Sequence, residues 1–368
     1  RKVFKDAIHY NNIYSNNKKR DCRGDELYNA LWAPIEKHLQ GVSTIYYSTD
    51  GVLHSLALHA MHDSAKVCLS DRYAMNLLSS TGDIQEFKSR KSRKPASAVV
   101  YGGAQFSVEN SDELVAATEK YNIRQQGDEL FAELQRSDSE GSWPYLPGTL
   151  AEAEYVKKKM DSIRVPARML TGIEANEESF KAMDRNAPQL LHVATHGFYI
   201  STQESDQISN FMDFLASAHN LDSVADAQSR SDAMLRSGLI FAGGNRAWSN
   251  REAIDGVEDG ILTSSEISSL NLSSTKLLVL AACQSGLGEA NDHEGVFGLQ
   301  RAFKLAGVET IIMTLWRVPD DTTAKLIQLF YDNWTAGMEK HAAFKKAQQQ
   351  IRAENPNPYY WGAFVILD

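Results

Sequence analysis

The chain has 368 residues, of which 43% are hydrophobic and 23% charged, and these proportions exclude a wholly disordered, collagenous or coiled-coil protein. A formal net charge of -9 argues against a nucleic-acid-binding core, which needs a basic surface. The longest uncharged apolar run covers residues 277–283 and is far shorter than the roughly 20 residues that cross a bilayer. We therefore expect neither nucleic acid nor a membrane among the partners, and the length allows two domains.

The three cysteines are Cys22, Cys68 and Cys283. An odd number at long spacings fits neither a disulfide framework nor a zinc ribbon, so we expect a reducing compartment, the cytoplasm. The sequence opens with Arg1 and shows neither an initiator Met nor an apolar signal core, as expected for a fragment of a longer protein.

In chain order, the polar residues 1–25 predict a tether or the end of upstream helical repeats. Apolar residues then recur every four positions over residues 25–40, which predicts an amphipathic helix. Asp50 and Gly51 separate two β-rich runs, residues 44–48 and 52–58, and this pattern predicts a hairpin. Further strands are expected at residues 65–69 and 97–101.

From residue 150 onward, predicted helices and strands alternate. We expect helices at residues 150–160, 177–183, 298–306 and 321–334, and strands at residues 168–170, 190–195, 276–282 and 310–315. Such alternation predicts an α/β fold with a largely parallel sheet. The polar stretch 201–232 is longer than ordinary connections, so it is either disordered or functional.

Two of these strands end in reactive residues. The strand at 190–195 leads into His196 and Gly197, and the strand at 276–282 leads into Cys283. Because the carboxyl ends of parallel strands meet at one edge of a sheet, and a thiol needs a base nearby to act as a thiolate, we predict a Cys283/His196 pair. The backbone N–H groups of Gly197 and Cys283 would form an oxyanion hole.

Other histidines and cysteines are weaker candidates. His192 and His196 are four residues apart on a strand, which separates their Cα atoms by roughly 13 Å, so one metal ion cannot bind both. Cys68 lies in a predicted apolar strand and is expected to be an inert core thiol, while Cys22 lies in the polar tether.

Several segments together resemble the CHAT domain family, a group of caspase-like, separase-related cysteine peptidases often found C-terminal to tetratricopeptide repeats. The resemblance rests on Thr195-His196-Gly197, residues 259–267 (DGILTSSEI), residues 281–288 (AACQSGLG), residues 295–303 (GVFGLQRAF), residues 314–318 (TLWRV) and residues 358–364 (PYYWGAF). These motifs follow one another in order from about Leu27 to Asp368.

The resemblance implies a caspase-like three-layer αβα sandwich with a largely parallel sheet. It implies an N-terminal lobe without a dyad at residues 26–165 and a catalytic lobe at 166–368, which carries the His196/Cys283 dyad and an oxyanion hole from Gly197 and Cys283. It implies a protein substrate and no metal or organic cofactor. It also implies a regulated role in bacterial defence or signalling, with upstream repeats or an activating partner. The alternative is a catalytically silent module that serves as a protein-binding signalling platform.

Asp320 is the candidate for substrate selection. It follows the predicted strand 310–315, whose carboxyl end borders the same crevice as Cys283, and a carboxylate there would bind a Lys or Arg side chain on the amino side of the cut. Separases carry a similar Leu-Trp-x-Val-x-Asp segment and cut after Arg. Alternatively, Asp320 caps the following helix, and the acidic group comes from Asp292, Glu294, Glu258 or Asp259.

Overall fold

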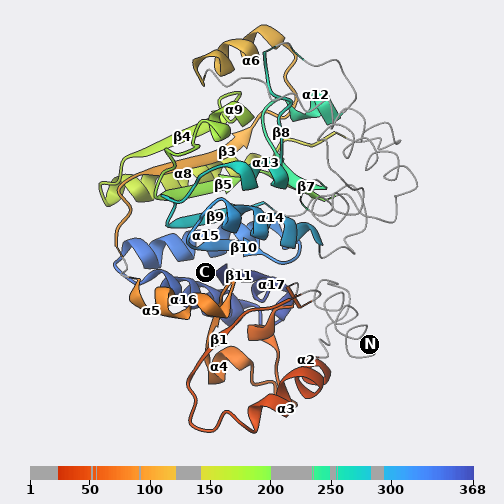
Figure 1. The fold of residues 1–368 in the computed structure, drawn as a ribbon, viewed down its shortest axis with the longest axis vertical. Helices are drawn as coiled ribbons and strands as arrows, with labels where there is room; N and C mark the ends of the chain where they lie inside the picture. Colours follow the sequence, from red (N-terminus) through yellow and green to blue (C-terminus); the bar gives the residue numbers. More distant parts are fainter. Residues whose placement is uncertain are drawn as a thin grey trace, which may run out of the picture. The chain divides into compact units, whose positions relative to one another are not determined.

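The structure is a computed structural model, and it describes residues 24–50, 53–54, 56–90, 93–121, 142–199, 234, 236–248, 254, 256–282 and 294–368. The chain forms two compact units, one from residues 1–94 and 310–368 and the other from residues 95–309 (Figure 1). The predicted boundary between lobes at residues 165 and 166 falls inside the second unit, and the division into an inactive and a catalytic lobe stays a prediction.

The first unit joins two stretches that are far apart in the sequence. Its elements are α2 (Gly24–Leu27), the π-helix η1 (Tyr28–Trp32), α3 (Ala33–Glu36), β1 (Thr44–Tyr47), the 3-10 helix η3 (Leu58–Ala60), α4 (Leu69–Arg72), β2 (Ala74–Leu77), the 3-10 helix η4 (Thr81–Asp83), α5 (Ile84–Ser89), β10 (Ile311–Thr314), α15 (Asp320–Thr335), α16 (Lys340–Glu354), α17 (Pro358–Trp361) and β11 (Phe364–Leu367). Strands β1 and β2 are parallel, β2 pairs in parallel with β11, and β11 is antiparallel to β10.

Helix α16 buries one stripe of side chains: Ala343, Phe344, Ala347 and Ile351. This spacing places them on one face of a helix. Helix α15 packs against α16 and buries Leu326, Ile327, Phe330 and Tyr331. The amphipathic pattern of residues 321–334 therefore serves the packing of these two helices.

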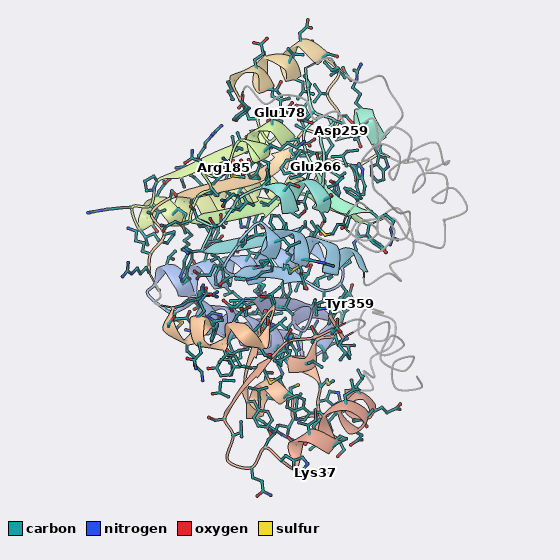
Figure 2. The ribbon with its side chains drawn as sticks, viewed as in Figure 1. Lys37, Glu178, Arg185, Asp259, Glu266 and Tyr359 are labelled. Carbon is teal, nitrogen blue, oxygen red and sulfur yellow. The ribbon has the colours of Figure 1, made fainter. Side chains whose placement is uncertain are left out.

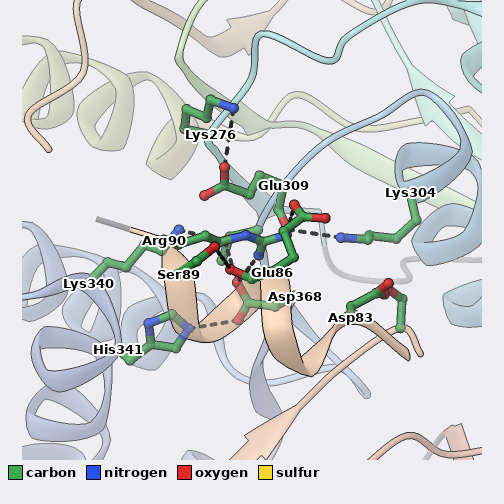
Figure 3. Close-up of polar contacts among 12 residues, drawn as sticks. Asp83, Glu86, Ser89, Arg90, Lys276, Lys304, Glu309, Lys340, His341 and Asp368 are labelled. Atoms are coloured by element: carbon green, nitrogen blue, oxygen red, sulfur yellow. Dashed lines mark hydrogen bonds and ion pairs between the residues drawn. The ribbon is translucent and has the colours of Figure 1, made fainter. Parts of the chain in front are cut away.

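Asp368, the residue after β11, forms a polar cluster with side chains from other parts of the first unit (Figure 3). The Asp368 carboxylate accepts hydrogen bonds from Thr310 Oγ1 at 2.7 Å, Arg90 at 3.0 Å and His341 Nε2 at 2.7 Å. Burial lowers the pKa of His341, but hydrogen bonds to Asp368 and Glu339 outweigh burial and raise that pKa to about 9. The imidazole is therefore charged at neutral pH and neutralises the buried carboxylate.

The second unit contains two sheets. Its elements are β3 (Ala98–Ala104), α6 (Ser111–Thr118), the 3-10 helix η5 (Glu119–Tyr121), α8 (Pro147–Ser162), β4 (Ala167–Gly172), α9 (Glu177–Lys181), β5 (Leu190–Ala194), β6 (His196–Tyr199), β7 (Ser237–Ile240), α12 (Gly244–Trp248), β8 (Ile261–Thr263), α13 (Ser264–Ser269), β9 (Leu277–Ala281) and α14 (Glu294–Leu305). Strands β9, β5, β3 and β4 are parallel neighbours in that order, whereas β6, β7 and β8 form an antiparallel sheet.

Strand β5 is buried along its whole length, and β9 is buried up to its last residue. Strand β9 is wholly apolar and β5 is apolar except for His192, a composition typical of parallel sheets that are covered on both faces. Helix α8 packs on β3, β4 and β5 and buries Ala153, Val156 and Met160. Gly102 permits this contact, because a Cβ there would come within 2.2 Å of the Thr149 carbonyl oxygen.

The predicted α/β class with a largely parallel sheet is confirmed, and so are the strands that the sequence indicates near residues 97–101, 168–170, 190–195, 276–282 and 310–315. The hairpin at Asp50 and Gly51 is wrong, because β1 pairs in parallel with β2 and residues 56–58 form no strand. The strand at residues 65–69 is also wrong. Asp63 Oδ1 accepts the N–H groups of Ala65 and Val67 there and holds a turn.

Within the described part of the chain, no helix combines the length and the apolar character that crossing a bilayer would require.

Candidate functional site

His196 lies where the chain leaves the parallel sheet and enters the antiparallel sheet. Strand β5 ends at Ala194, which pairs with Ala281 at the end of β9. His196 then begins β6 and pairs with Ile240 of β7. Both parallel strands therefore direct their following residues to the same edge of the sheet, as the sequence predicts.

The His196 imidazole is buried, with 2% of the residue exposed. Its ring lies 4.8 Å from the ring centre of Phe106 and 5.0 Å from that of Trp143. Its Nε2 is 2.8 Å from the carbonyl oxygen of Pro144. Because a carbonyl oxygen only accepts, Nε2 carries the proton in this contact, and Nδ1 is the basic nitrogen of the neutral ring.

The other predicted site residues are only partly described. Cys283 lies two positions beyond β9 and, like Cys22, is outside the described residues, so the Cys283/His196 pair stays a prediction. Gly197 is buried in β6 opposite Leu239 of β7. Its role in an oxyanion hole likewise stays a prediction.

Cys68 is the free thiol among the described residues, and it is buried. Burial raises the pKa of this thiol to about 11, so the thiolate that attack on a carbonyl requires is scarce at neutral pH. Cys68 precedes α4 as its N-cap residue rather than lying in the predicted strand. The expectation that its thiol is an inert core group fits this setting.

A cavity of about 510 Å³ shares two walls with the His196 site. It lies at the carboxyl ends of β3 and β4, where the register of the two strands shifts between Tyr101 and Ala104. Its lining includes Phe106 and Trp143, which contact the His196 ring, together with Gln105 and Tyr145. The described lining carries no charged side chain.

Asp320 begins α15 in the first unit, and its side chain is exposed. The N-cap position of this helix is held by Pro319, so Asp320 contributes a negative charge to the first turn, where the helix dipole favours one. His196 belongs to the second unit. The role of Asp320 in a substrate pocket therefore stays a prediction.

Two of the alternative acidic residues are engaged within the second unit. Glu258 Oε2 lies 3.1 Å from Lys181 Nζ, and Asp259 Oδ1 accepts the N–H of Ile261 at 2.8 Å. Asp292 is outside the described residues, as is the side chain of Glu294.

A charged cluster centres on Lys181, in the part of the second unit where Figure 2 labels Glu178, Asp259 and Glu266. The Lys181 ammonium lies 2.8 Å from Glu177, 3.1 Å from Glu258 and 2.7 Å from Glu266. These three carboxylates are the group among the described residues that is close enough to hold a metal ion. Since the Lys181 ammonium lies among these carboxylates and pairs with all three, we interpret the cluster as a structural ion network.

This network accounts for part of the 259–267 segment on which the family resemblance rests. Gly260 donates its N–H to Glu177 Oε2 at 2.9 Å. Thr263 and Glu266 form a capping box at the start of α13. These bonds hold β8 and α13 in place.

Sequence reasoning missed Phe106, Trp143 and the Pro144 carbonyl. Aromatic residues in loops are common, and a backbone carbonyl has no side-chain signature. The sequence therefore offered no signal that these groups surround His196.

Comparisons with known proteins point to one family. The CHAT domain model matches residues 22–367. Tetratricopeptide repeat protein 28 from Homo sapiens is 27% identical over 113 residues, and the Mus musculus protein of that name is 28% identical over 109 residues. The matches cover 30% and 29% of this chain but 4% of each relative.

One similar solved structure is the crystal structure of the Arg-specific cysteine proteinase gingipain R. It matches with a TM-score of 0.46 and 7% sequence identity. The match covers 92% of this chain and 66% of that chain.

Proposed function

Because the chain belongs to the CHAT domain family, we propose that it is a cysteine endopeptidase with Cys283 as nucleophile and His196 as proton-transfer group. The observation that carries this proposal is the setting of His196. Its Nε2–H is bound to the Pro144 carbonyl, which assigns the basic lone pair to Nδ1, and β9 leads towards Cys283 from the strand next to β5.

In the proposed reaction, the Cys283 thiol transfers its proton to His196, and the thiolate attacks the carbonyl carbon of a peptide bond. The tetrahedral intermediate collapses when the C–N bond breaks, and the His196 imidazolium protonates the leaving amine. Water then attacks the thioester while His196 accepts its proton, which releases the acid and regenerates the thiol.

The negative charge on the carbonyl oxygen needs stabilisation in both steps. We assign this role to the backbone N–H groups of Gly197 and Cys283. Removing one donor from such a site costs about 10²–10³-fold in kcat.

The test is labelling with a biotinylated peptidyl acyloxymethyl ketone that carries Arg at its reactive end. We expect the unmodified chain to be labelled and Cys283→Ala and His196→Ala to be unlabelled, because the members of one catalytic unit fail together. The matched control is Cys68→Ala, which removes the buried thiol of high pKa and is expected to leave labelling unchanged.

Labelling of Cys283→Ala would overturn the assignment of the nucleophile. An unlabelled but folded wild-type chain, tested with probes that carry Arg, Asp and Leu, would favour the alternative of a silent protein-binding platform.

We also propose that the enzyme prefers a basic residue on the amino side of the cut, with Asp320 as its partner. The support is the exposed carboxylate of Asp320 on the chain segment that follows β10. Profiling on a peptide library is expected to show a preference for Arg or Lys that Asp320→Ala removes. The matched control is Asp321→Ala, which alters the neighbouring carboxylate in the same helical turn.

We propose that this activity is regulated in the cytoplasm by upstream tetratricopeptide repeats or by an activating partner, in bacterial defence or signalling. Both relatives are named tetratricopeptide repeat proteins, which supports the part of this proposal that concerns upstream repeats. The bacterial role rests on the family resemblance alone.

A further inference from the structure

The backbone N–H and C=O groups of Trp143, the residue before Pro144, are both bound by the side chain of Asn245 in α12. The Asn245 amide oxygen accepts the backbone N–H of Trp143 at 2.7 Å. Its amide nitrogen donates to the backbone carbonyl of Trp143 at 2.9 Å. Both backbone groups of the residue before Pro144 are therefore bound by one amide.

Asn245 also holds the second aromatic wall of the His196 site. Its amide nitrogen donates to Ser107 Oγ at 2.8 Å, and its backbone N–H donates to the Phe106 carbonyl at 3.0 Å. Asn245 is 6% exposed. The two chain segments that contact the imidazole ring are thus joined through one buried residue.

We propose that Asn245 is a positioning residue for His196. By fixing the backbone of Trp143, it sets the position of the next carbonyl, that of Pro144, and this carbonyl holds the proton on His196 Nε2. The influence of Asn245 on the protonated nitrogen of His196 follows from these hydrogen bonds alone. An influence of Asn245 on turnover rests, in addition, on the proposed peptidase function.

An amide is suited to this position because it donates and accepts through one planar group. An aspartate would keep the acceptor for the Trp143 N–H but would direct a second oxygen at the Trp143 carbonyl, where no donor would remain. Alanine would leave both buried backbone groups of Trp143 without these bonds, which is costly in a dry site.

The turn before α12 brings Asn245 to this place. Gly243 has φ of +83°, in the left-handed region that favours glycine. A Cβ on Gly244 would lie 2.8 Å from the Gly260 carbonyl oxygen. The two glycines therefore let the chain turn closely past residue 260 and present Asn245 to Phe106 and Trp143.

The experiment records the ¹⁵N chemical shifts of the two His196 ring nitrogens at a pH where the ring is neutral. In a fixed tautomer, the protonated and unprotonated nitrogens resonate far apart. We expect this separation in the wild-type chain, and we expect the two signals to move towards each other in Asn245→Ala as the Nδ1–H tautomer becomes populated.

The matched control is Asn176→Ala, which removes another buried amide from the second unit. Asn176 accepts from the Ser179 N–H and donates to the Ile173 carbonyl, each at 2.9 Å, at the start of α9. We expect it to lower the melting temperature while the His196 signals stay in place. Unchanged His196 signals in folded Asn245→Ala, or equal changes in both variants, would overturn the proposal.

If Asn245→Ala does not fold, Asn245→Asp decides the question, because it keeps one of the two bonds to Trp143. Altered His196 signals in this variant support the proposal, and wild-type signals refute it. Where turnover is measurable, we expect kcat to fall by about 10²-fold, as for a misplaced catalytic group, with KM nearly unchanged. The imidazole signals require no activity, so failure of the peptidase proposal would leave this test valid.

Discussion

Lys181 supplies the positive charge among the carboxylates of Glu177, Glu258 and Glu266. Burial, followed by the neighbouring negative charges, raises the pKa of Glu177 well above its usual value. The network is therefore short of positive charge even with Lys181 present, and its stability depends strongly on this one side chain.

We expect Lys181→Met to lower the free energy of unfolding by about 3–5 kcal/mol, because it leaves buried carboxylates without their cation. Urea unfolding at pH 7 measures the change. The control is Lys157→Met, which breaks the more exposed pair with Asp161 and is expected to cost at most about 0.5 kcal/mol. Equal losses in the two variants would contradict the role assigned to Lys181.

His341 makes the stability of the first unit depend on pH. Hydrogen bonds to Asp368 and Glu339 overcome burial and raise the folded-state pKa to about 9, above the ordinary value of about 6.5. The charged imidazole therefore stabilises the fold fully below pH 6.5, by about 3 kcal/mol. This contribution is lost as the pH rises through about 9.

The expected result is a melting temperature that falls between pH 7 and pH 10 more steeply in the wild-type chain than in His341→Gln. Thermal unfolding followed by circular dichroism at a series of pH values measures it. The same slope in both proteins would show that another group is responsible.

At the scale of elements, the turn between β7 and α12 and the start of β8 approach each other through glycines. Gly260 has φ of +78°, and a Cβ there would lie 2.6 Å from the backbone nitrogen of Gly244. Gly256 has nearly the same φ, +79°, but a Cβ there would meet nothing within 4 Å. An alanine at position 256 would therefore meet backbone strain alone, whereas an alanine at position 260 would meet both backbone strain and a steric clash.

We expect Gly256→Ala to cost about 1–2 kcal/mol of stability from the left-handed conformation alone. Gly260→Ala should cost about 1–3 kcal/mol more, because the backbone of residue 244 must shift. Chemical unfolding of both variants measures the difference. A similar cost at both positions would mean that the two turns are not closely packed.

The elements that the sequence predicts well are those whose pattern is set by burial. Strand β9 is a continuous apolar run, β5 is apolar except for His192, and α8 repeats its buried positions with helical spacing. The prediction of a hairpin was wrong because Asp50-Gly51 is a local signal, whereas the pairing of β1 with β2 depends on residues about thirty positions away. The short strands β6–β8 were missed because three or four residues carry too little periodicity.

The same limit applies to the candidate site. His196 could be found because it closely follows an apolar strand of the parallel sheet. Its hydrogen bond to Pro144 joins residues 52 positions apart in the chain, and the hydrogen bond between Asn245 and Trp143 joins residues 102 positions apart. Such contacts arise from tertiary packing, which no local pattern encodes.

At the scale of the whole molecule, the first unit is completed by the last strand of the chain. Strand β11 pairs with β2 on one side and with β10 on the other, and Asp368 gathers Arg90, Thr310 and His341. Removing residues 363–368 therefore takes away both a central strand and the acceptor of this cluster.

We expect a chain truncated after Gly362 to lose protection in the first unit. Limited proteolysis should cut within residues 44–90 much faster than in the full chain, because β1 and β2 alone form too small a sheet to be stable. The control is Ile366→Val, which retains the strand and its backbone pairing. Equal resistance of the truncated and full chains would contradict a central role for β11.

The position of β11 at the end of the chain also decides when β2 can form its full pairing during synthesis. Strand β2 ends at Leu77, but its partner β11 begins only at Phe364. At translation rates of about 5–20 residues per second, β11 is synthesised roughly 15–60 s after β2. During that interval the nascent chain presents an unpaired strand edge that other chains can add to, so a chaperone that covers residues 44–77 would raise the yield of folded protein.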